Sequence, residues 1–128
     1  MVDSLVAAAR EAQERAYAPY SRYRVGAAVE AEDGTIYTGC NVENASYGLT
    51  LCAERVALGT AMTAGARGFL RIAVVSSSEP PASPCGGCRQ VLAELAPNAE
   101  VIAVGPLSEA RWMVADLLPH AFSSDHLA

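Results

Sequence analysis

Two short motifs hold the residues of this chain that are best suited to metal chemistry. They are Cys52-Ala53-Glu54 and, thirty residues after Glu54, Pro84-Cys85-Gly86-Gly87-Cys88. Three thiolates can bind a Zn²⁺ ion and leave its fourth tetrahedral position for water, as catalytic zinc sites do. Glu54 is close enough to its neighbouring cysteine to exchange protons with that water without binding the metal. The motifs therefore predict Cys52, Cys85 and Cys88 as ligands of one zinc ion, with Glu54 as the catalytic acid–base.

Three other interpretations of these residues stay open. Cys85 and Cys88 could be a redox dithiol, Cys40 could complete a structural zinc site with four cysteines, and Glu54 could be a solvated carboxylate on a helix surface. A redox dithiol does not need a remote Cys-x-Glu motif. A structural site would leave Glu54 without a task. Both arguments favour the catalytic zinc site.

Length and composition indicate one ordinary domain. The chain has 128 residues, of which 52% are hydrophobic, enough to build one core. We expect a single catalytic domain over residues 1–128. No signal peptide and no membrane-length apolar run is recognisable, so we expect a cytoplasmic protein without a membrane partner.

The charge of the chain argues against several classes of partner and chemistry. Nine basic and fourteen acidic residues give a net charge of −5, which makes nucleic acid an unfavourable partner. All nine basic residues are Arg. The absence of Lys excludes a Schiff-base lysine and the lysine of a phosphate-binding loop. Four cysteines in a reducing compartment favour metal binding over disulfides.

Periodicity and turn residues predict an α/β fold in which strands and helices alternate. We expect a three-layer α/β/α arrangement around a five-stranded mixed sheet. Only six residues, 105–110, separate the last two strands, so these should pair antiparallel, because a parallel crossover needs a dozen or more. The Asp33-Gly34 pair predicts a hairpin between the first two strands. The expected helices are 2–17, 52–64, 87–95 and a turn at 116–122, and the expected strands are 25–31, 35–42, 71–77, 99–104 and 111–115.

The predicted helices place the three cysteines at helix starts. Cys52 begins one helix, and Cys85 with Cys88 begins another. Helix N-termini present free N–H groups and partial positive charge, which lower the pKa of thiols and offset the negative charge of three thiolates. Arg55 and Arg89, each next to a cysteine, could add hydrogen bonds to sulfur.

Beyond the zinc motifs, segments from about residue 16 to residue 125 closely resemble the small homotetrameric zinc-dependent cytidine deaminases. The resemblance implies the cytidine deaminase-like fold, with one Zn²⁺ per subunit. It also implies hydrolysis of cytidine and deoxycytidine to uridine and deoxyuridine with release of ammonia, in pyrimidine salvage. It further implies a homotetramer with shared active sites. The segments are Tyr20-Ser21-x-Tyr23-x-Val25-Gly26-Ala27-Ala28, Gly39-Cys40-Asn41-Val42-Glu43-Asn44-Ala45-Ser46-Tyr47-Gly48, Cys52-Ala53-Glu54-Arg55, Pro84-Cys85-Gly86-Gly87-Cys88-Arg89-Gln90 and Leu117-Leu118-Pro119-x-Ala121-Phe122.

The same resemblance assigns roles to individual residues. Asn41 and Glu43 would hold the ribose hydroxyls, and the backbone around Ala53 would help to read the base. Arg55 would hydrogen-bond the zinc thiolates. The remaining substrate-binding positions would be an aromatic ring on the pyrimidine and two pocket-lining groups from neighbouring subunits: Tyr23, Tyr47 and Phe122.

The chain departs from the family pattern at one place. The family usually has Phe-Pro before Val-Gly-Ala-Ala, and this chain has Tyr23-Arg24. Tyr23 keeps a flat ring for packing on the pyrimidine but adds a hydroxyl, and it could equally be a plain core aromatic. Arg24 is expected to add a charge near the mouth of the pocket.

Several functions other than cytidine deamination share parts of this pattern. A blasticidin-type aminonucleoside antibiotic deaminase has the same zinc motifs, but the Asn41-x-Glu43 pair and the Leu118-Pro119-x-Ala121-Phe122 ending favour cytidine. A nucleic-acid deaminase usually has His as its first ligand and a basic surface. A non-enzymatic zinc-stabilised binding module would keep the metal but tolerate loss of Glu54.

Overall fold

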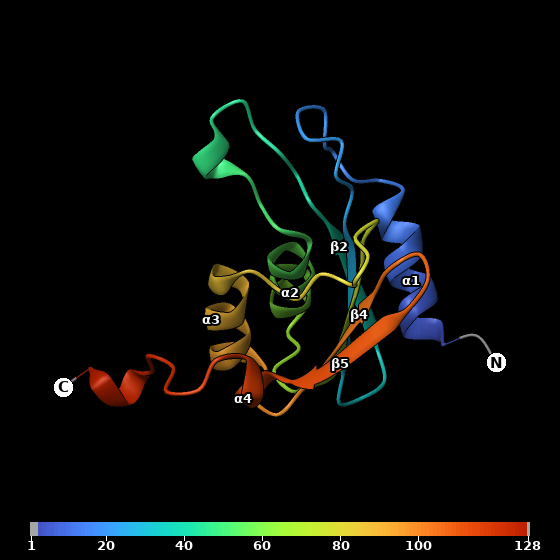
Figure 1. The fold of residues 1–128 in the computed structure, drawn as a ribbon. Helices are drawn as coiled ribbons and strands as arrows, with labels where there is room; N and C mark the ends of the chain where they lie inside the picture. The colour runs from blue at the N-terminus through green and yellow to red at the C-terminus, as the bar shows by residue number, and fades with distance from the viewer. Residues whose placement is uncertain (1–2, 128) are drawn as a thin grey trace.

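The computed structural model describes residues 3–127 of the chain, and its five strands form one mixed sheet (Figure 1). The strand order is β2-β1-β3-β4-β5. β3 and β4 are parallel, and the other neighbouring pairs are antiparallel. The expected antiparallel pairing of the last two strands is therefore confirmed. The strands are β1 Gly26–Ala31, β2 Ile36–Cys40, β3 Phe69–Val75, β4 Glu100–Val104 and β5 Glu109–Met113.

Helices cover both faces of the sheet and complete the predicted three-layer arrangement. Helix α1, Ser4–Gln13, lies on one face, and α2, Ala53–Thr63, and α3, Gly86–Leu95, lie on the other (Figure 1). The short helix α4, Val114–Leu117, follows β5 and contacts α3, and two 3₁₀ helices cover Tyr47–Leu49 and Ser124–His126. Within residues 3–127, no helix has the length and apolar composition that a membrane crossing requires.

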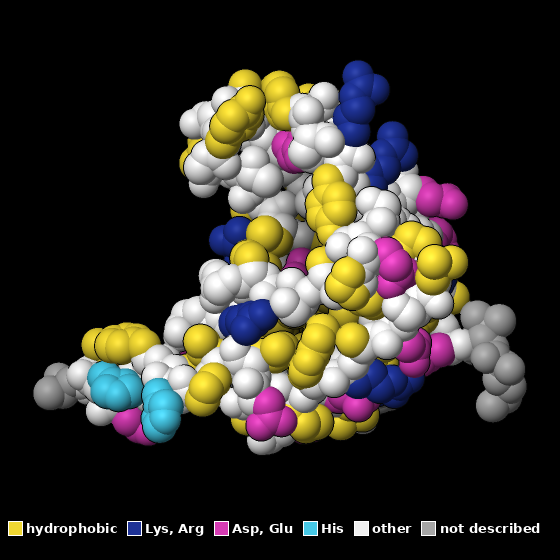
Figure 2. All heavy atoms as spheres, in the orientation of Figure 1, with side chains coloured by type: hydrophobic (Ala, Val, Ile, Leu, Met, Phe, Trp, Pro, Cys, Tyr) yellow, Lys and Arg dark blue, Asp and Glu magenta, His cyan; other side chains and the backbone are white. Residues whose placement is uncertain are grey.

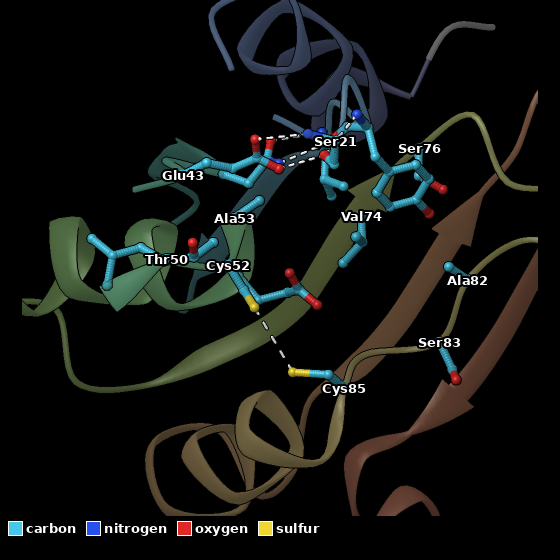
Figure 3. A pocket seen from close by; sticks show the side chains of 15 residues that line it. Ser21, Glu43, Thr50, Cys52, Ala53, Val74, Ser76, Ala82, Ser83 and Cys85 are labelled. Carbon is cyan, nitrogen blue, oxygen red and sulfur yellow. Dashed lines mark hydrogen bonds between the residues drawn. The ribbon is translucent and has the colours of Figure 1, made fainter. Parts of the chain in front are cut away.

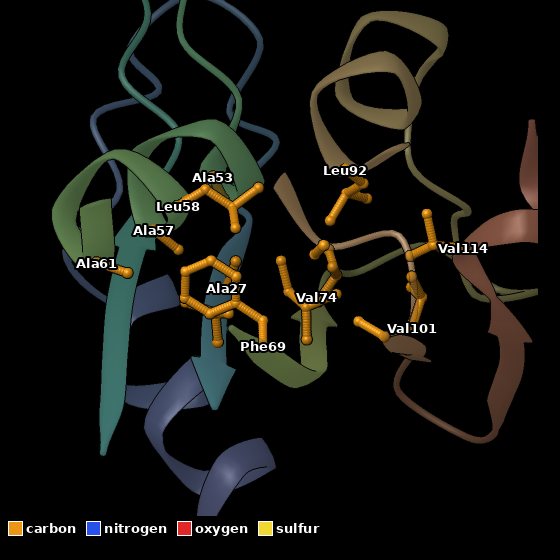
Figure 4. Packing of buried hydrophobic residues seen from close by; sticks show 14 of the residues in the cluster. Ala27, Ala53, Ala57, Leu58, Ala61, Phe69, Val74, Leu92, Val101 and Val114 are labelled. Atoms are coloured by element: carbon orange, nitrogen blue, oxygen red, sulfur yellow. The ribbon is translucent and has the colours of Figure 1, made fainter. Parts of the chain in front are cut away.

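The main core lies between the sheet and the two helices that carry the cysteine motifs. Ala53, Ala57 and Ala61 point from α2 toward the strands, and Leu92 does so from α3 (Figure 4). A smaller cluster that includes Leu5 and residues of β1, β3 and β4 fills the face under α1. Burial of these apolar side chains is the dominant force that holds α2 and α3 to the sheet.

A glycine in β2 lets α2 approach the sheet closely. A Cβ atom at Gly39 would lie 2.3 Å from the backbone nitrogen of Ala57 and 2.8 Å from the carbonyl oxygen of Ala53. No larger residue fits without moving the helix. Because Ala53 is the first residue of α2, this contact fixes the height at which the neighbouring Cys52 and Glu54 sit above the sheet.

Several element boundaries differ from the sequence prediction: β2 and β3 end two residues earlier, at Cys40 and Val75, and α4 covers Val114–Leu117 rather than 116–122. Strand pairing and turn geometry explain two further differences. Helix α1 ends at Gln13 rather than residue 17, because Tyr17 forms a bridge with Val42; Val2, its expected start, is outside the described residues. Strand β5 begins at Glu109, two residues earlier than predicted. A tight turn, closed by the Gly105 N–H donating to the Ser108 carbonyl at 2.9 Å, needs fewer residues.

Candidate active site

The structure brings the three predicted zinc ligands together. Cys52 directly precedes α2, Cys85 directly precedes α3, and Cys88 lies in the first turn of α3. Their sulfur atoms all lie within 4.8 Å of one another. The Sγ atoms of Cys52 and Cys85 face each other at 3.8 Å (Figure 3).

This spacing fits a tetrahedral zinc ion. Two sulfurs each about 2.3 Å from zinc, at the tetrahedral angle, lie about 3.8 Å apart. The separation of Cys52 and Cys85 matches that value. Cys40 does not belong to the cluster. Three sulfurs therefore leave one position of the metal open, as a catalytic site requires.

Arg55 compensates the negative charge of the cluster. Its Nη2 atom donates to the Cys52 sulfur at 3.3 Å. The pKa of Cys52 is lowered to about 5, first by a hydrogen bond from the Cys88 thiol and then by Arg55. The shared proton and burial raise the pKa of Cys88. The site therefore holds at least one thiolate near neutral pH even before a metal enters.

Glu54 is buried beside the cysteines. Its exposed fraction is only 6%, so it is not a solvated carboxylate on a helix surface. Burial raises its pKa, and the negative charge of Cys52 raises it further. A higher pKa makes the carboxylate a stronger base, which helps it to accept a proton and later return it, as general acid–base catalysis needs.

A pocket of about 280 Å³ extends from the cysteines to the residues that are expected to bind the sugar. Its volume is near the lower end of the range for small-molecule sites. Four predicted substrate-binding residues line it together with Glu54: Tyr23, Asn41, Glu43 and Ala53. In Figure 3, Glu43 and Ser21 lie at the opposite end from the Cys52–Cys85 contact.

Comparison with known proteins agrees with this geometry. The family model described as the cytidine and deoxycytidylate deaminase zinc-binding region matches residues 2–104. The chain belongs to this family. A cytidine deaminase of Sporosarcina psychrophila is 48% identical, over 99% of this chain and 95% of the relative. A cytidine deaminase of Mycobacterium tuberculosis is 45% identical, over 93% of this chain and 87% of the relative.

A solved structure gives the same result at the level of the fold. The crystal structure of cytidine deaminase from Burkholderia pseudomallei superposes with a TM-score of 0.91 at 50% identity, and the match covers 95% of this chain and all of that one. Membership of the cytidine deaminase family confirms the fold class, the hydrolytic deaminase function and the zinc cofactor that the motifs predict.

The two residues that the family resemblance assigns to neighbouring subunits lie outside this pocket. Tyr47 is 74% exposed and packs edge-on against Tyr20, with ring centroids 6.0 Å apart. Phe122 is 58% exposed and stacks on His126. Figures 1 and 2 show the C-terminal segment, which carries both histidines in cyan, extending away from the body of the molecule.

The contacts of Arg89 and the location of Arg24 differ from the sequence prediction. Arg89 does not contact sulfur: its guanidinium donates to the carbonyl oxygens of Pro84 and Leu117 and to the Ser83 hydroxyl. It therefore holds the loop before α3 rather than compensating thiolate charge. Arg24 lies outside the pocket, with its guanidinium 3.5 Å from the Glu14 carbonyl at the end of α1, because Tyr23 and Val25 on either side of it face the pocket.

Sequence reasoning gave no role to several serines that line the pocket. Ser76 is buried and follows β3 directly, at the carboxyl end of a parallel strand, where α/β proteins usually bind ligands. Its position near the end of a predicted strand could have identified it as a candidate pocket residue. Ser83 precedes Cys85 in a loop that carries no periodic pattern, so nothing in the sequence marks it. Ser21 belongs to a motif of the family, but its partner Glu43 is 22 residues away.

Proposed function

We propose that the chain, as a single catalytic domain over residues 1–128, hydrolyses cytidine and deoxycytidine to uridine and deoxyuridine with release of ammonia, in pyrimidine salvage. The observation that carries the proposal is a cluster of three cysteine sulfurs, two of which, Cys52 and Cys85, line one pocket together with the buried Glu54. Cys52, Cys85 and Cys88 would hold the zinc ion. When bound, zinc would supply the Lewis acidity that activates water near neutral pH.

Glu54 would carry the protons of the reaction. From its place beside the cysteines it would accept a proton from the attacking water. It would pass this proton to N3 of the pyrimidine, then take the proton of the new C4 hydroxyl and deliver it to the 4-amino nitrogen, so that ammonia leaves as the C4 carbonyl forms. Its burial supports this role, because a carboxyl group shielded from solvent exchanges its proton with the substrate rather than with bulk water.

Four other residues would bind and orient the nucleoside. The Tyr23 ring would pack on the pyrimidine, the Ala53 backbone would read the base, and Asn41 and Glu43 would hold the ribose hydroxyls. The Asn41 side chain accepts from the Val25 N–H at 2.9 Å and donates to the Tyr23 carbonyl at 2.8 Å. A primary amide has two donors and two acceptor sites, so one of each remains for the substrate.

Two alternative functions make different use of the same pocket. A blasticidin-type deaminase would not need a carboxylate placed for a ribose hydroxyl, and the position of Glu43 on the pocket wall favours a nucleoside. In a non-enzymatic zinc module Glu54 would have no function, although burying its carboxylate costs free energy of folding. Both observations support the cytidine deaminase.

We further propose that the active enzyme is a homotetramer with shared sites. Tyr47 and Phe122 are large aromatic side chains that lie exposed and outside their own pocket, which supports a role in the pocket of a neighbouring subunit. Helix α2 gives no such support, because its small residues Ala53, Ala57 and Ala61 are buried against the sheet of the same chain. The cytoplasmic location stays a prediction.

A spectroscopic assay tests the proposed function directly. Purified zinc-loaded protein should convert the ultraviolet spectrum of cytidine, and separately of deoxycytidine, to that of the uracil nucleoside, with stoichiometric ammonia. Blasticidin S and a single-stranded cytosine oligonucleotide serve as competing substrates. Turnover of either one in place of the free nucleosides would contradict the proposal.

A further inference from the structure

The Glu43 carboxylate is held by the backbone and side chain of the segment opposite it. One oxygen, Oε1, accepts from the N–H groups of Tyr20 at 3.0 Å and Ser21 at 3.2 Å. The other oxygen, Oε2, accepts from the Ser21 hydroxyl. Figure 3 shows the contacts between Ser21 and Glu43 as dashed lines. A side chain that is itself exposed therefore has a fixed position at the rim of the pocket.

The Ser21 hydroxyl can point in only one direction. Its oxygen accepts a hydrogen bond from the Tyr23 N–H at 3.0 Å. A hydroxyl has a single donor hydrogen, and Glu43 is the acceptor that the structure places beside it. The Tyr23 backbone is held independently by Asn41 at 2.8 Å, so the hydroxyl of Ser21 is aimed by a rigid segment.

We propose that Ser21 is a positioning residue that makes the pocket selective for a nucleoside with a free sugar hydroxyl opposite Glu43, an inference that rests on the proposed function of Glu43. A carboxylate has about four acceptor sites, and three are occupied by Tyr20 and Ser21. The acceptor site that remains is directed by the other three. Ser21 itself does not touch the reacting atoms.

The charge of Glu43 supports this role. The hydrogen bond from the Ser21 hydroxyl is the largest cause that lowers the pKa of Glu43, and the two N–H donors lower it further. Hydrogen bonds to a charged acceptor are shorter and stronger than those to a neutral one. Glu43 is therefore ionised throughout the neutral pH range. The ionised carboxylate is the form that accepts the stronger hydrogen bond from a sugar hydroxyl.

The test compares two substrates in variants at Ser21. Cytidine carries the 2′- and 3′-hydroxyls, and 2′,3′-dideoxycytidine carries neither. Ser21→Ala should raise the KM for cytidine about tenfold, the usual effect of one hydrogen bond to a charged group, with kcat changed by less than about twofold. The KM for 2′,3′-dideoxycytidine should stay within about twofold. Ser21→Thr, which keeps the hydroxyl, should recover most of the loss.

Ser108 provides a matched control. Its hydroxyl donates to the Glu79 carboxylate at 2.5 Å, in the same kind of serine–glutamate pair, but neither residue lines the pocket. Ser108→Ala should leave both KM values unchanged. Ser21→Gly is a second hydroxyl deletion, in case Ser21→Ala does not fold, and Ser21→Ala should add no further loss in a Glu43→Gln background.

Three results would overturn the inference, and they are distinguishable. An equal loss for both substrates in Ser21→Ala would show a general structural role. An unchanged KM for cytidine would show that Glu43 needs no positioning by Ser21. Failure of the unmodified protein to deaminate cytidine at all would reject the proposed function and this inference with it.

Discussion

Glu54 is the residue on which the proposed chemistry depends most directly. Glu54→Gln keeps the size and shape of the side chain but cannot accept and return a proton. We expect the variant to fold and to retain zinc, with turnover of cytidine lowered at least about 10²-fold, the lower bound of general acid–base effects. The measurement is kcat by ultraviolet assay together with zinc content by elemental analysis. Near-normal turnover would remove Glu54 from the mechanism.

The cysteines give a second test at the same scale. Cys85→Ser should lose most of the bound zinc, because Cys85 belongs to the sulfur cluster, whereas Cys40→Ser should retain it. The measurement is the molar ratio of zinc to protein after gel filtration, with a value near one expected for the unmodified chain. Equal loss of metal in both variants would indicate a structural site with four cysteines instead.

Residues that act within a short motif could be predicted from the sequence, and residues that act through a distant partner could not. Cys52, Glu54 and Cys85 could be identified because each lies in a short motif whose internal spacing is typical of zinc ligands and their acid–base group. The contact of Ser21 with Glu43 depends on how two loops meet, 22 residues apart. Arg89 stood next to a ligand in sequence, but its guanidinium reaches the loop before α3 instead.

At the scale of elements, the close approach of α2 to β2 sets the position of the site. Gly39→Ala should lower the free energy of unfolding by about 1–3 kcal/mol, the usual cost of overpacking, because its Cβ would overlap the α2 backbone. Any shift of α2 would also move Cys52 and Glu54, so kcat should fall in the protein that remains folded. Denaturant unfolding and the ultraviolet assay measure the two effects.

Gly59 is the matched control for Gly39. It lies within α2, but a Cβ there would meet nothing within 4 Å. Gly59→Ala should raise the free energy of unfolding by about 0.4–1 kcal/mol, because it restricts the unfolded chain and favours the helix. If both substitutions were neutral, the packing of α2 on the sheet would be looser than the structure shows.

The kinds and order of the elements could be predicted better than their ends. The Asp33-Gly34 hairpin and the short connection between β4 and β5 are local signals, and the structure has both. The end of α1 is set by the pairing of Tyr17 with Val42, and no local pattern near Tyr17 indicates a partner 25 residues away. Tertiary pairing therefore overrides the helical periodicity there.

At the scale of the whole molecule, the exposed position of Phe122 allows a test of shared sites. Glu54→Gln chains and Phe122→Ala chains should each be inactive or nearly so. Mixed and allowed to exchange subunits, they should recover part of the activity, because some pockets would then receive Glu54 and Phe122 from different chains. The measurement is deamination after exchange, with fluorescence energy transfer between labelled chains to follow mixing. Mixed oligomers without recovery would place Phe122 in its own pocket or in none.

The three sulfurs lie at the N-terminal ends of two helices, with Cys52 and Cys85 33 residues apart in sequence, and this placement gives the metal a structural role as well. It would tie the two helices together as a staple, and an unfolded chain offers no such preformed site. Because zinc then binds the folded chain and not the unfolded one, the free energy of unfolding rises with the concentration of free zinc. Free zinc at a hundred times the dissociation constant adds about 2.7 kcal/mol to it. Chelation should therefore lower the Tm by roughly 10 °C, as measured by scanning calorimetry. An enzyme with this metal site would lose its resistance to heat and proteolysis when it loses zinc. Zinc limitation would therefore lead to degradation of the protein as well as to loss of its activity.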